Sequence, residues 1–311
     1  MRRLPWRQIF CVLPIAAVAV WVTRHWSVIG GGFDEVLAAD GAWLLAAVGT
    51  TLLGWVAVSF ARQGTVLERL PAKRLVVTQF AAGAANHLLP SGIGAGAVNI
   101  RFMARCGLPP ARYSAALALY FLAEGVARGS LLLALLLIFP EALRLETLLP
   151  ERIGLPLIGA FALALLVAAV VTVLAVARLR RLVGGFLRTA LTDIRSLHAR
   201  PSRVLALWGG SLAFPLLQAA GLVAVAFSMD LGVPVGHLAL AYMAATVVAA
   251  AVPSPGGIGS VDASLVIALV AVGAAVGAAT STVLAYRVIT VWLPLLPGAL
   301  VLGALVRRKV V

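Results

Sequence analysis

The chain has 311 residues, of which 62% are hydrophobic and 12% are charged, with a mean hydropathy of +1.05 and a formal net charge of +14. A soluble domain of this size could not bury so much apolar surface, so the composition excludes a soluble protein and indicates an integral membrane protein. Neither the alternating segments of a membrane β-barrel nor a polar block large enough for a soluble catalytic domain occurs. We predict an all-α fold, with residues 1–311 forming one polytopic transmembrane domain.

Six full membrane spans are predicted along the chain. The first apolar run, residues 9–22, follows three arginines, and small residues at 17–19 would also suit a cleaved signal peptide. We interpret the run as an uncleaved first helix, which suits a multi-spanning protein better. The other runs long enough to cross a bilayer lie at 42–61, 113–139, 153–177, 204–228 and 281–305.

The distribution of charge predicts the orientation. Twenty of the 25 Lys and Arg residues cluster at the chain ends and in alternate loops, whereas the intervening loops hold seven of the 11 acids. This positive-inside pattern predicts a protein of the cytoplasmic membrane with both termini cytoplasmic, and it explains the net charge without a nucleic-acid partner. It also requires the broken segments 75–100 and 237–276 to be re-entrant hairpins, entering from the cytoplasmic and outer faces respectively.

The two breaks resemble each other, which indicates an internal repeat. P-S-G-I-G-A at 90–95 and P-G-G-I-G-S at 255–260 keep Pro, Gly, Ile and Gly in register, 165 residues apart. The halves, about 1–139 and 153–305, then form an inverted-topology repeat, as in transporters whose broken helices present unpaired N–H groups to a ligand. The alternative is that the glycines only permit tight turns and close helix packing.

Four ionisable residues lie inside predicted membrane segments. Glu124 and Arg128 are four residues apart on one span, Asp262 follows the second break, and Arg287 begins the last span. Each charge would cost at least about 2.5 kcal/mol at the bilayer centre, so each should face protein or water. Glu124 can pair with Arg128, and Arg287 with Asp262 or Glu124. These groups either form a structural ion-pair cluster or bind an anionic head group.

Enzyme chemistry has little support in the sequence. We find no phosphate-binding G-x-x-x-x-G-K-[ST] loop, no G-x-S-x-G elbow and no H-E-x-x-H motif, and the four histidines lack ligand spacing. We therefore expect no catalytic residue, no metal and no cofactor.

Three blocks resemble the transmembrane domain family of lysylphosphatidylglycerol synthases, a flippase-like membrane domain that also occurs as stand-alone proteins. N-H-L-L-P-S-G-I-G at 86–94, with Arg101 downstream, resembles the family's N-x-L-L-P-x-x-x-G block. P-S-P-G-G-I-G-S-V-D at 253–262 resembles P-x-P-G-G-x-G-x-x-E, and A-Y-R at 285–287 resembles a Y-R step. The chain departs from the family in reading Ala-Gly-Ala at 95–97 where Glu is usual, Asp262 in place of Glu, and E-G-V-A-R at 124–128 in place of E-R-x-x-D.

The resemblance implies a translocase for a membrane lipid or lipid-linked head group, without lysylphosphatidylglycerol synthesis, because no aminoacyl-transferase domain is recognised. We expect the anionic head group to be held between hairpins 75–100 and 237–276. The alternatives are an accessory subunit that presents a lipid to a separately encoded biosynthetic enzyme and a small-solute secondary transporter; a homodimer is a further expectation. The predicted substrate-binding residues are Asn86, Gly92, Gly94, Arg101, Glu124, Arg128, Pro255, Gly256, Gly257, Gly259, Asp262, Tyr286 and Arg287.

Overall fold

The structure, a computed structural model, describes residues 39–88, 93–140, 142, 199–250 and 259–307. Within these ranges every regular element is helical, which confirms the all-α prediction for the described part of the chain. The helices are α3 (Gly41–Gly64), α4 (Ala72–Leu88), α5 (Ile93–Arg105), α6 (Pro110–Ile138), α9 (Pro201–Val204), α10 (Gly210–Ser228), α11 (Val235–Ala250), α12 (Ser260–Ala271), α13 (Val276–Arg287) and α14 (Leu293–Arg307). Two π-helical turns, η3 (Leu205–Gly209) and η5 (Val288–Trp292), join α9 to α10 and α13 to α14.

Four helical stretches in the described part are long and apolar enough to cross a membrane. They are Gly41–Gly64, Pro110–Ile138, Pro201–Ser228 and Val276–Leu305, and they coincide with four of the six predicted spans. The other two predictions, at 9–22 and 153–177, lie outside the described residues. The chain is therefore a helical membrane protein with several spans.

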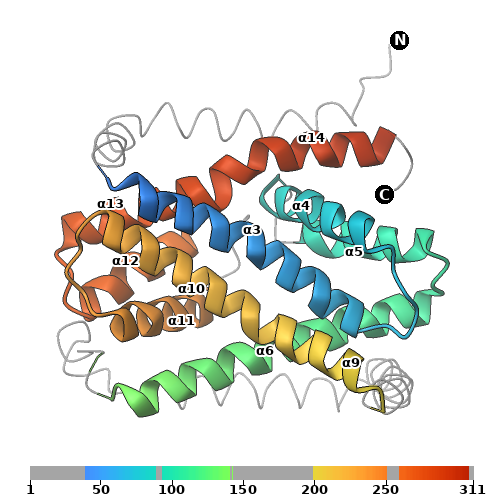
Figure 1. The fold of residues 1–311 in the computed structure, drawn as a ribbon, viewed down its shortest axis with the longest axis horizontal. Coiled ribbons are helices and arrows are strands. Elements are labelled where there is room, and N and C mark those ends of the chain that lie inside the picture. The colour runs from blue at the N-terminus through green and yellow to red at the C-terminus, as the bar shows by residue number, and fades with distance from the viewer. Residues whose placement is uncertain (1–38, 89–92, 141, 143–198, 251–258, 308–311) are drawn as a thin grey trace, which may run out of the picture.

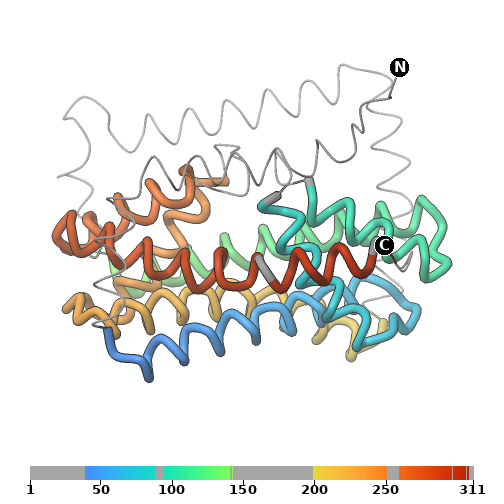
Figure 2. Tube along the Cα trace, turned by 90° about the horizontal axis from the view of Figure 1, so that it is seen from above, coloured from blue at the N-terminus to red at the C-terminus, as the bar shows by residue number. Residues whose placement is uncertain are grey.

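The two broken segments form two pairs of shorter helices at opposite ends of the molecule. Figures 1 and 2 both place α4 and α5 at one end and α11 and α12 at the other, with α3, α6, α10 and α14 running between the ends. Within each pair the two helices pack against each other. The predicted tips, at 89–92 and 251–258, lie outside the described residues.

Local sequence signals set where several helices begin. The Asp40 carboxylate accepts a hydrogen bond from the Ala42 N–H (2.9 Å), an N-cap that satisfies one free donor of α3. Pro110 occupies the first turn of α6, where a missing N–H costs nothing. At α12 the Asp262 carboxylate accepts from the Gly259 N–H (2.8 Å), and Gly259 has φ +89°, a conformation that favours glycine.

The last span contains a π turn in its middle. The sequence predicts a helix over 281–305, and the structure has one helical stretch, Val276–Leu305, in which the π turn Val288–Trp292 joins α13 to α14. Pro294 follows this turn and has no N–H to donate to the preceding turn of helix, so the backbone widens locally. Thr290 in this turn and Pro294 just after it both line an internal cavity.

Helices α3 and α10 form the most extensive helix contact among the described elements. Their backbones approach closely because glycine lies at the crossing: a Cβ atom added at Gly210 would lie 2.5 Å from the Ala57 carbonyl oxygen and 2.6 Å from the Ala61 nitrogen. Such small-residue contacts are a principal source of helix association in membranes, where lipid removes the hydrophobic driving force.

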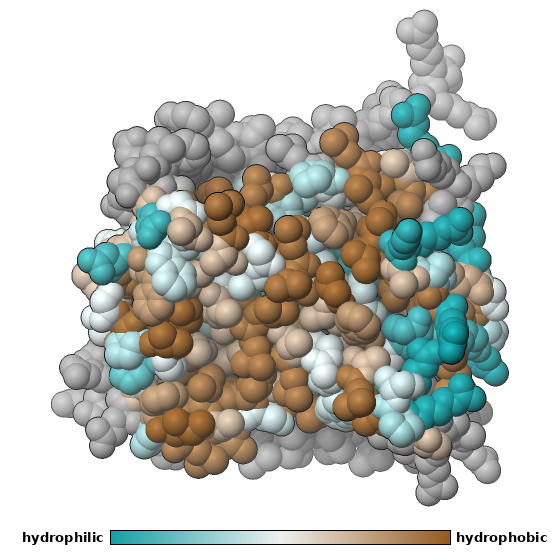
Figure 3. Space-filling model, viewed as in Figure 1, coloured by the Kyte–Doolittle hydropathy of each residue, from teal (hydrophilic) through white to brown (hydrophobic). Residues whose placement is uncertain are grey.

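The surface is strongly asymmetric in charge. Figure 3 shows hydrophobic residues across the middle of the molecule and hydrophilic residues gathered at the end that carries α4 and α5. The exposed basic residues of the described chain that belong to loops and helix ends there are Arg69, Lys73, Arg74, Arg101, Arg105, Arg112, Arg200 and Arg307. Asp40 and Asp230 lie at the other end of α3 and α10, where the Asp40 N–H donates to the Ser228 carbonyl (3.1 Å).

We predict that Gly210→Ala destabilises the protein whereas Gly209→Ala does not. The added methyl at 210 must displace the α3 backbone, and such overpacking costs about 1–3 kcal/mol. A Cβ at the neighbouring Gly209 meets nothing within 4 Å, so this variant is a matched control. Thermal unfolding in detergent measures both; equal melting temperatures would contradict the close α3–α10 crossing.

Candidate functional site

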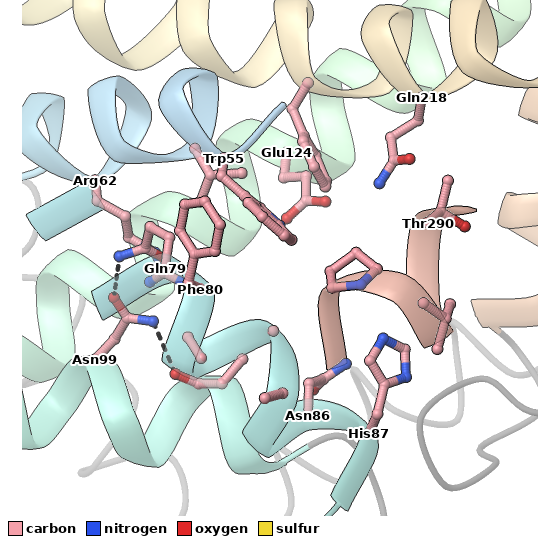
Figure 4. A pocket seen from close by; sticks show the side chains of 18 of the residues that line it. Trp55, Arg62, Gln79, Phe80, Asn86, His87, Asn99, Glu124, Gln218 and Thr290 are labelled. Carbon is pink, nitrogen blue, oxygen red and sulfur yellow. Dashed lines mark hydrogen bonds between the residues drawn. The ribbon is translucent and has the colours of Figure 1, made fainter. Parts of the chain in front are cut away.

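A polar cavity of about 310 Å³ lies between the long helices, lined by residues of α3, α4, α5, α6, α10, η5 and α14 (Figure 4). Its polar lining residues are Arg62, Gln79, Asn86, His87, Asn99, Tyr120, Glu124, Gln218 and Thr290. The lining thus combines residues from both predicted halves of the chain. Among the described residues α4 and α5 contribute to it, whereas α11 and α12 do not.

Arg62 is the most unusual side chain of this cavity. It is 3% exposed, and neither Nε nor Nη1 has a hydrogen-bond partner within the described chain. Its guanidinium carbon lies 3.5 Å from the centroid of the Tyr120 ring, so a cation–π contact is its main compensation. No carboxylate among the described residues lies within ion-pair distance of it.

A pair of amides forms one wall of the cavity next to Arg62. The Gln79 Nε2 donates to the Asn99 Oδ1 (3.0 Å), and this bond ties α4 to α5. The Asn99 Nδ2 donates to the Ala95 carbonyl of its own helix (2.8 Å). Both side chains are buried. Gly94 permits this pairing, because a Cβ there would lie 2.0 Å from the Ala85 carbonyl oxygen.

Glu124 and Arg128 form the predicted ion pair within α6. The Arg128 Nη2 lies 2.9 Å from the Glu124 Oε1, and the Nε donates to the same oxygen at 3.2 Å. Both side chains are about one-fifth exposed, at 18% for Glu124 and 21% for Arg128. Glu124 faces the cavity, where Figure 4 shows it between Trp55 and Gln218.

A hydrogen bond between α13 and α10 holds Gln218 at the cavity wall. The Tyr286 ring packs edge to face against the Tyr242 ring, with centroids 6.2 Å apart. The Tyr286 hydroxyl donates to the Gln218 Oε1 (3.0 Å) and lies 3.2 Å from its backbone carbonyl. Tyr286, a predicted site residue, thus acts here by holding Gln218 at the cavity wall.

Asp262 and Arg287 form a second ion pair, through Asp262 Oδ1 and Arg287 Nε. The alternative partner of Arg287, Glu124, pairs with Arg128 instead. The Asp262–Arg287 pair joins α12 to the end of α13 within the second half, and neither residue lines the cavity. Because Asp262 also caps α12, the pair ties the start of α12 to the end of α13.

The remaining predicted residues divide between the surface, a packing contact and the undescribed tips. Arg101 is exposed on α5 and does not line the cavity. Gly94 allows the close contact between α4 and α5, and Gly259 is the N-cap residue of α12. Gly92, Pro255, Gly256 and Gly257 lie outside the described residues.

Arg62 and Gln218 were not among the residues predicted from the sequence. Arg62 falls in a predicted cytoplasmic basic cluster because the predicted helix ends at residue 61, whereas α3 continues to Gly64 and buries the side chain. A signal was present: Trp55, Val58 and Arg62 follow one another at helical spacing and all line the cavity. Gln218 was identifiable as the amide in the middle of an apolar span.

Comparison with protein families agrees with the sequence blocks. The model of the lysylphosphatidylglycerol synthase TM region matches residues 9–298. The chain belongs to this family. No curated protein matches it significantly. Membership supports a function connected with membrane lipids, and the cavity described above is the family member's candidate site.

We predict strong coupling between Glu124 and Arg128. Removing one partner leaves a partly buried charge without compensation, whereas removing both does not. The losses of stability caused by Glu124→Gln and Arg128→Gln should therefore add up to more than the loss caused by the double variant. Contacting pairs typically couple by about 0.5–3 kcal/mol. Thermal or denaturant unfolding of the four proteins measures this; purely additive effects would contradict a functional ion pair.

Proposed function

We propose that this protein is a membrane lipid translocase that binds an anionic lipid head group in the cavity beside Arg62. The acyl chains would remain in the bilayer while the head group passes through the polar interior. The proposal extends the lipid-related function of the family to a specific activity and a specific binding group.

The burial of Arg62 is the observation that carries the proposal. Desolvating a guanidinium costs several kcal/mol, and a cation–π contact returns only about 2 kcal/mol. A phosphate accepts bidentate hydrogen bonds from arginine and would supply the missing negative charge. An arginine held at a cost to stability, next to a cavity between membrane helices, is what a head-group site requires.

The local charge balance favours a head group with one net negative charge. Arg62 and Arg128 contribute two positive charges and Glu124 contributes one negative charge, and Glu124 is already paired with Arg128. Among the described lining residues, the positive charge without an ion-pair partner is therefore that of Arg62. A phosphodiester monoanion would neutralise the site, whereas a cationic head group would add to the imbalance.

The helix arrangement supports transport rather than static binding. In the predicted inverted repeat, α3 corresponds to α10, the α4–α5 pair to α11–α12, and α6 to the last span. The helix contacts obey this correspondence: α4 packs against α14 of the last span, and their counterparts in the other half, α11 and α6, also pack against each other. Two broken helix pairs at opposite ends of the molecule (Figure 1), of which α4–α5 lines the cavity, fit the inverted-repeat architecture of secondary transporters.

The charge asymmetry supports the predicted orientation, in which the basic end faces the cytoplasm. With that orientation, a membrane potential that is negative inside would favour outward movement of an anionic head group. The bias is about 2.3 kcal/mol per charge per 100 mV. No nucleotide-driven step is needed for net flow in that direction.

We predict that Arg62→Gln lowers translocation of fluorescently labelled phosphatidylglycerol at least tenfold in proteoliposomes. The physical reason is loss of the only uncompensated cation of the described cavity lining. The rate is measured from the label's accessibility to dithionite added outside. Because the substitution removes a desolvated charge, the melting temperature should rise, which separates loss of function from loss of folding.

Arg69→Gln is the matched control, since Arg69 is exposed at the basic end of the same region. Its translocation rate should stay within twofold of the unmodified protein. An Arg62→Gln protein that translocates as fast as the control would refute the assigned role. Absence of translocation by the unmodified protein would refute the transport activity itself.

A further inference from the structure

We infer that the cavity selects a hydroxylated head group, a phosphodiester whose second ester carries a glycerol, inositol or sugar, and that Gln218 and Thr290 recognise its hydroxyls. This inference rests on the proposed function and adds the class of head group. It follows from the polar groups at the end of the cavity away from Arg62 (Figure 4).

Gln218 presents an oriented donor to the cavity. Its Oε1 accepts the Tyr286 hydroxyl at 3.0 Å, and Tyr286 is 3% exposed, so the side-chain amide is held in one orientation. The Nε2 points toward the cavity in Figure 4, and no described residue accepts a hydrogen bond from it. An amide donor fixed in this way in an apolar span needs an acceptor, which a ligand hydroxyl provides.

Thr290 presents the complementary acceptor. Its hydroxyl donates to the Tyr286 carbonyl at 2.8 Å, so the hydrogen is already used and the oxygen's lone pairs remain. Thr290 lies in the π turn of the last span and lines the cavity with Gln218. One fixed donor and one fixed acceptor in the same part of the cavity (Figure 4) match the donor and acceptor capacity of hydroxyl groups.

The separation of the polar groups matches the two parts of such a head group. Figure 4 shows Arg62 and the Gln79–Asn99 pair on one side of the cavity and Gln218 and Thr290 on the other, with Glu124 between them. The phosphate would lie at Arg62 and the hydroxyl-bearing part at Gln218. The only carboxylate in the described lining, Glu124, is paired with Arg128, so it is not free to balance the charge of a cationic head group.

Phosphatidylethanol provides the decisive comparison, because it carries the same phosphodiester charge as phosphatidylglycerol and phosphatidylinositol but no head-group hydroxyl. We would titrate dioctanoyl forms of the three lipids into the full-length protein in detergent and measure Kd by calorimetry. We expect phosphatidylglycerol and phosphatidylinositol, or one of them, to bind at least tenfold more tightly than phosphatidylethanol. Which of the two binds more tightly distinguishes a glycerol from a cyclic polyol.

The variants test the assignment to individual residues. Thr290→Val is nearly isosteric and Gln218→Leu leaves Tyr286 the backbone carbonyl of residue 218 as an acceptor, so both should fold. Each should weaken binding of the preferred lipid threefold or more and leave phosphatidylethanol binding unchanged. Arg62→Gln should weaken binding of all three lipids alike.

The possible failures are distinguishable. Equal binding of phosphatidylethanol and both hydroxylated lipids by the unmodified protein would overturn the hydroxyl recognition and leave the anionic head-group site in place. Absence of binding by all three lipids would overturn the proposed function as well. Hydroxyl selectivity that survives both Thr290→Val and Gln218→Leu would overturn the residue assignment.

Discussion

A polar group inside a bilayer must find its partners within the protein, and most of this structure follows from that constraint. Membrane lipid offers no hydrogen bonds, so helices satisfy the backbone and the side-chain charges must meet one another. Glu124 meets Arg128 on its own helix, and Asp262 meets Arg287 across two helices. Arg62 forms no ion pair with a carboxylate within the described chain, and this exception marks the candidate site.

The same constraint connects the packing with the cavity. Small residues bring α3 against α10 and α4 against α5, because close backbone contact replaces the hydrophobic effect as the source of association. The π turn of the last span and Pro294 both contribute to the lining of the cavity. The tightly packed glycine contacts therefore surround a polar space, to which both halves of the chain contribute.

Much of the helical framework was predictable from residue periodicity and composition. Four spans appear where apolar runs of bilayer length predicted them, and the two Pro/Gly breaks separate the paired helices. The Glu124–Arg128 pair followed from spacing alone, because residues four apart share a helix face. The partner of Arg287 did not, since Asp262 and Glu124 were equally available until the helices were placed in three dimensions.

The sequence by itself determined that the chain is a helical membrane protein of the lysylphosphatidylglycerol synthase TM region family, because span length, hydropathy and the sequence blocks are local properties. Only the tertiary structure decided which polar residues share a cavity. Arg62, Asn99, Glu124 and Gln218 come from four helices, and their convergence depends on helix crossings. Helical periodicity predicts which face a side chain occupies, but not which neighbouring helix that face meets.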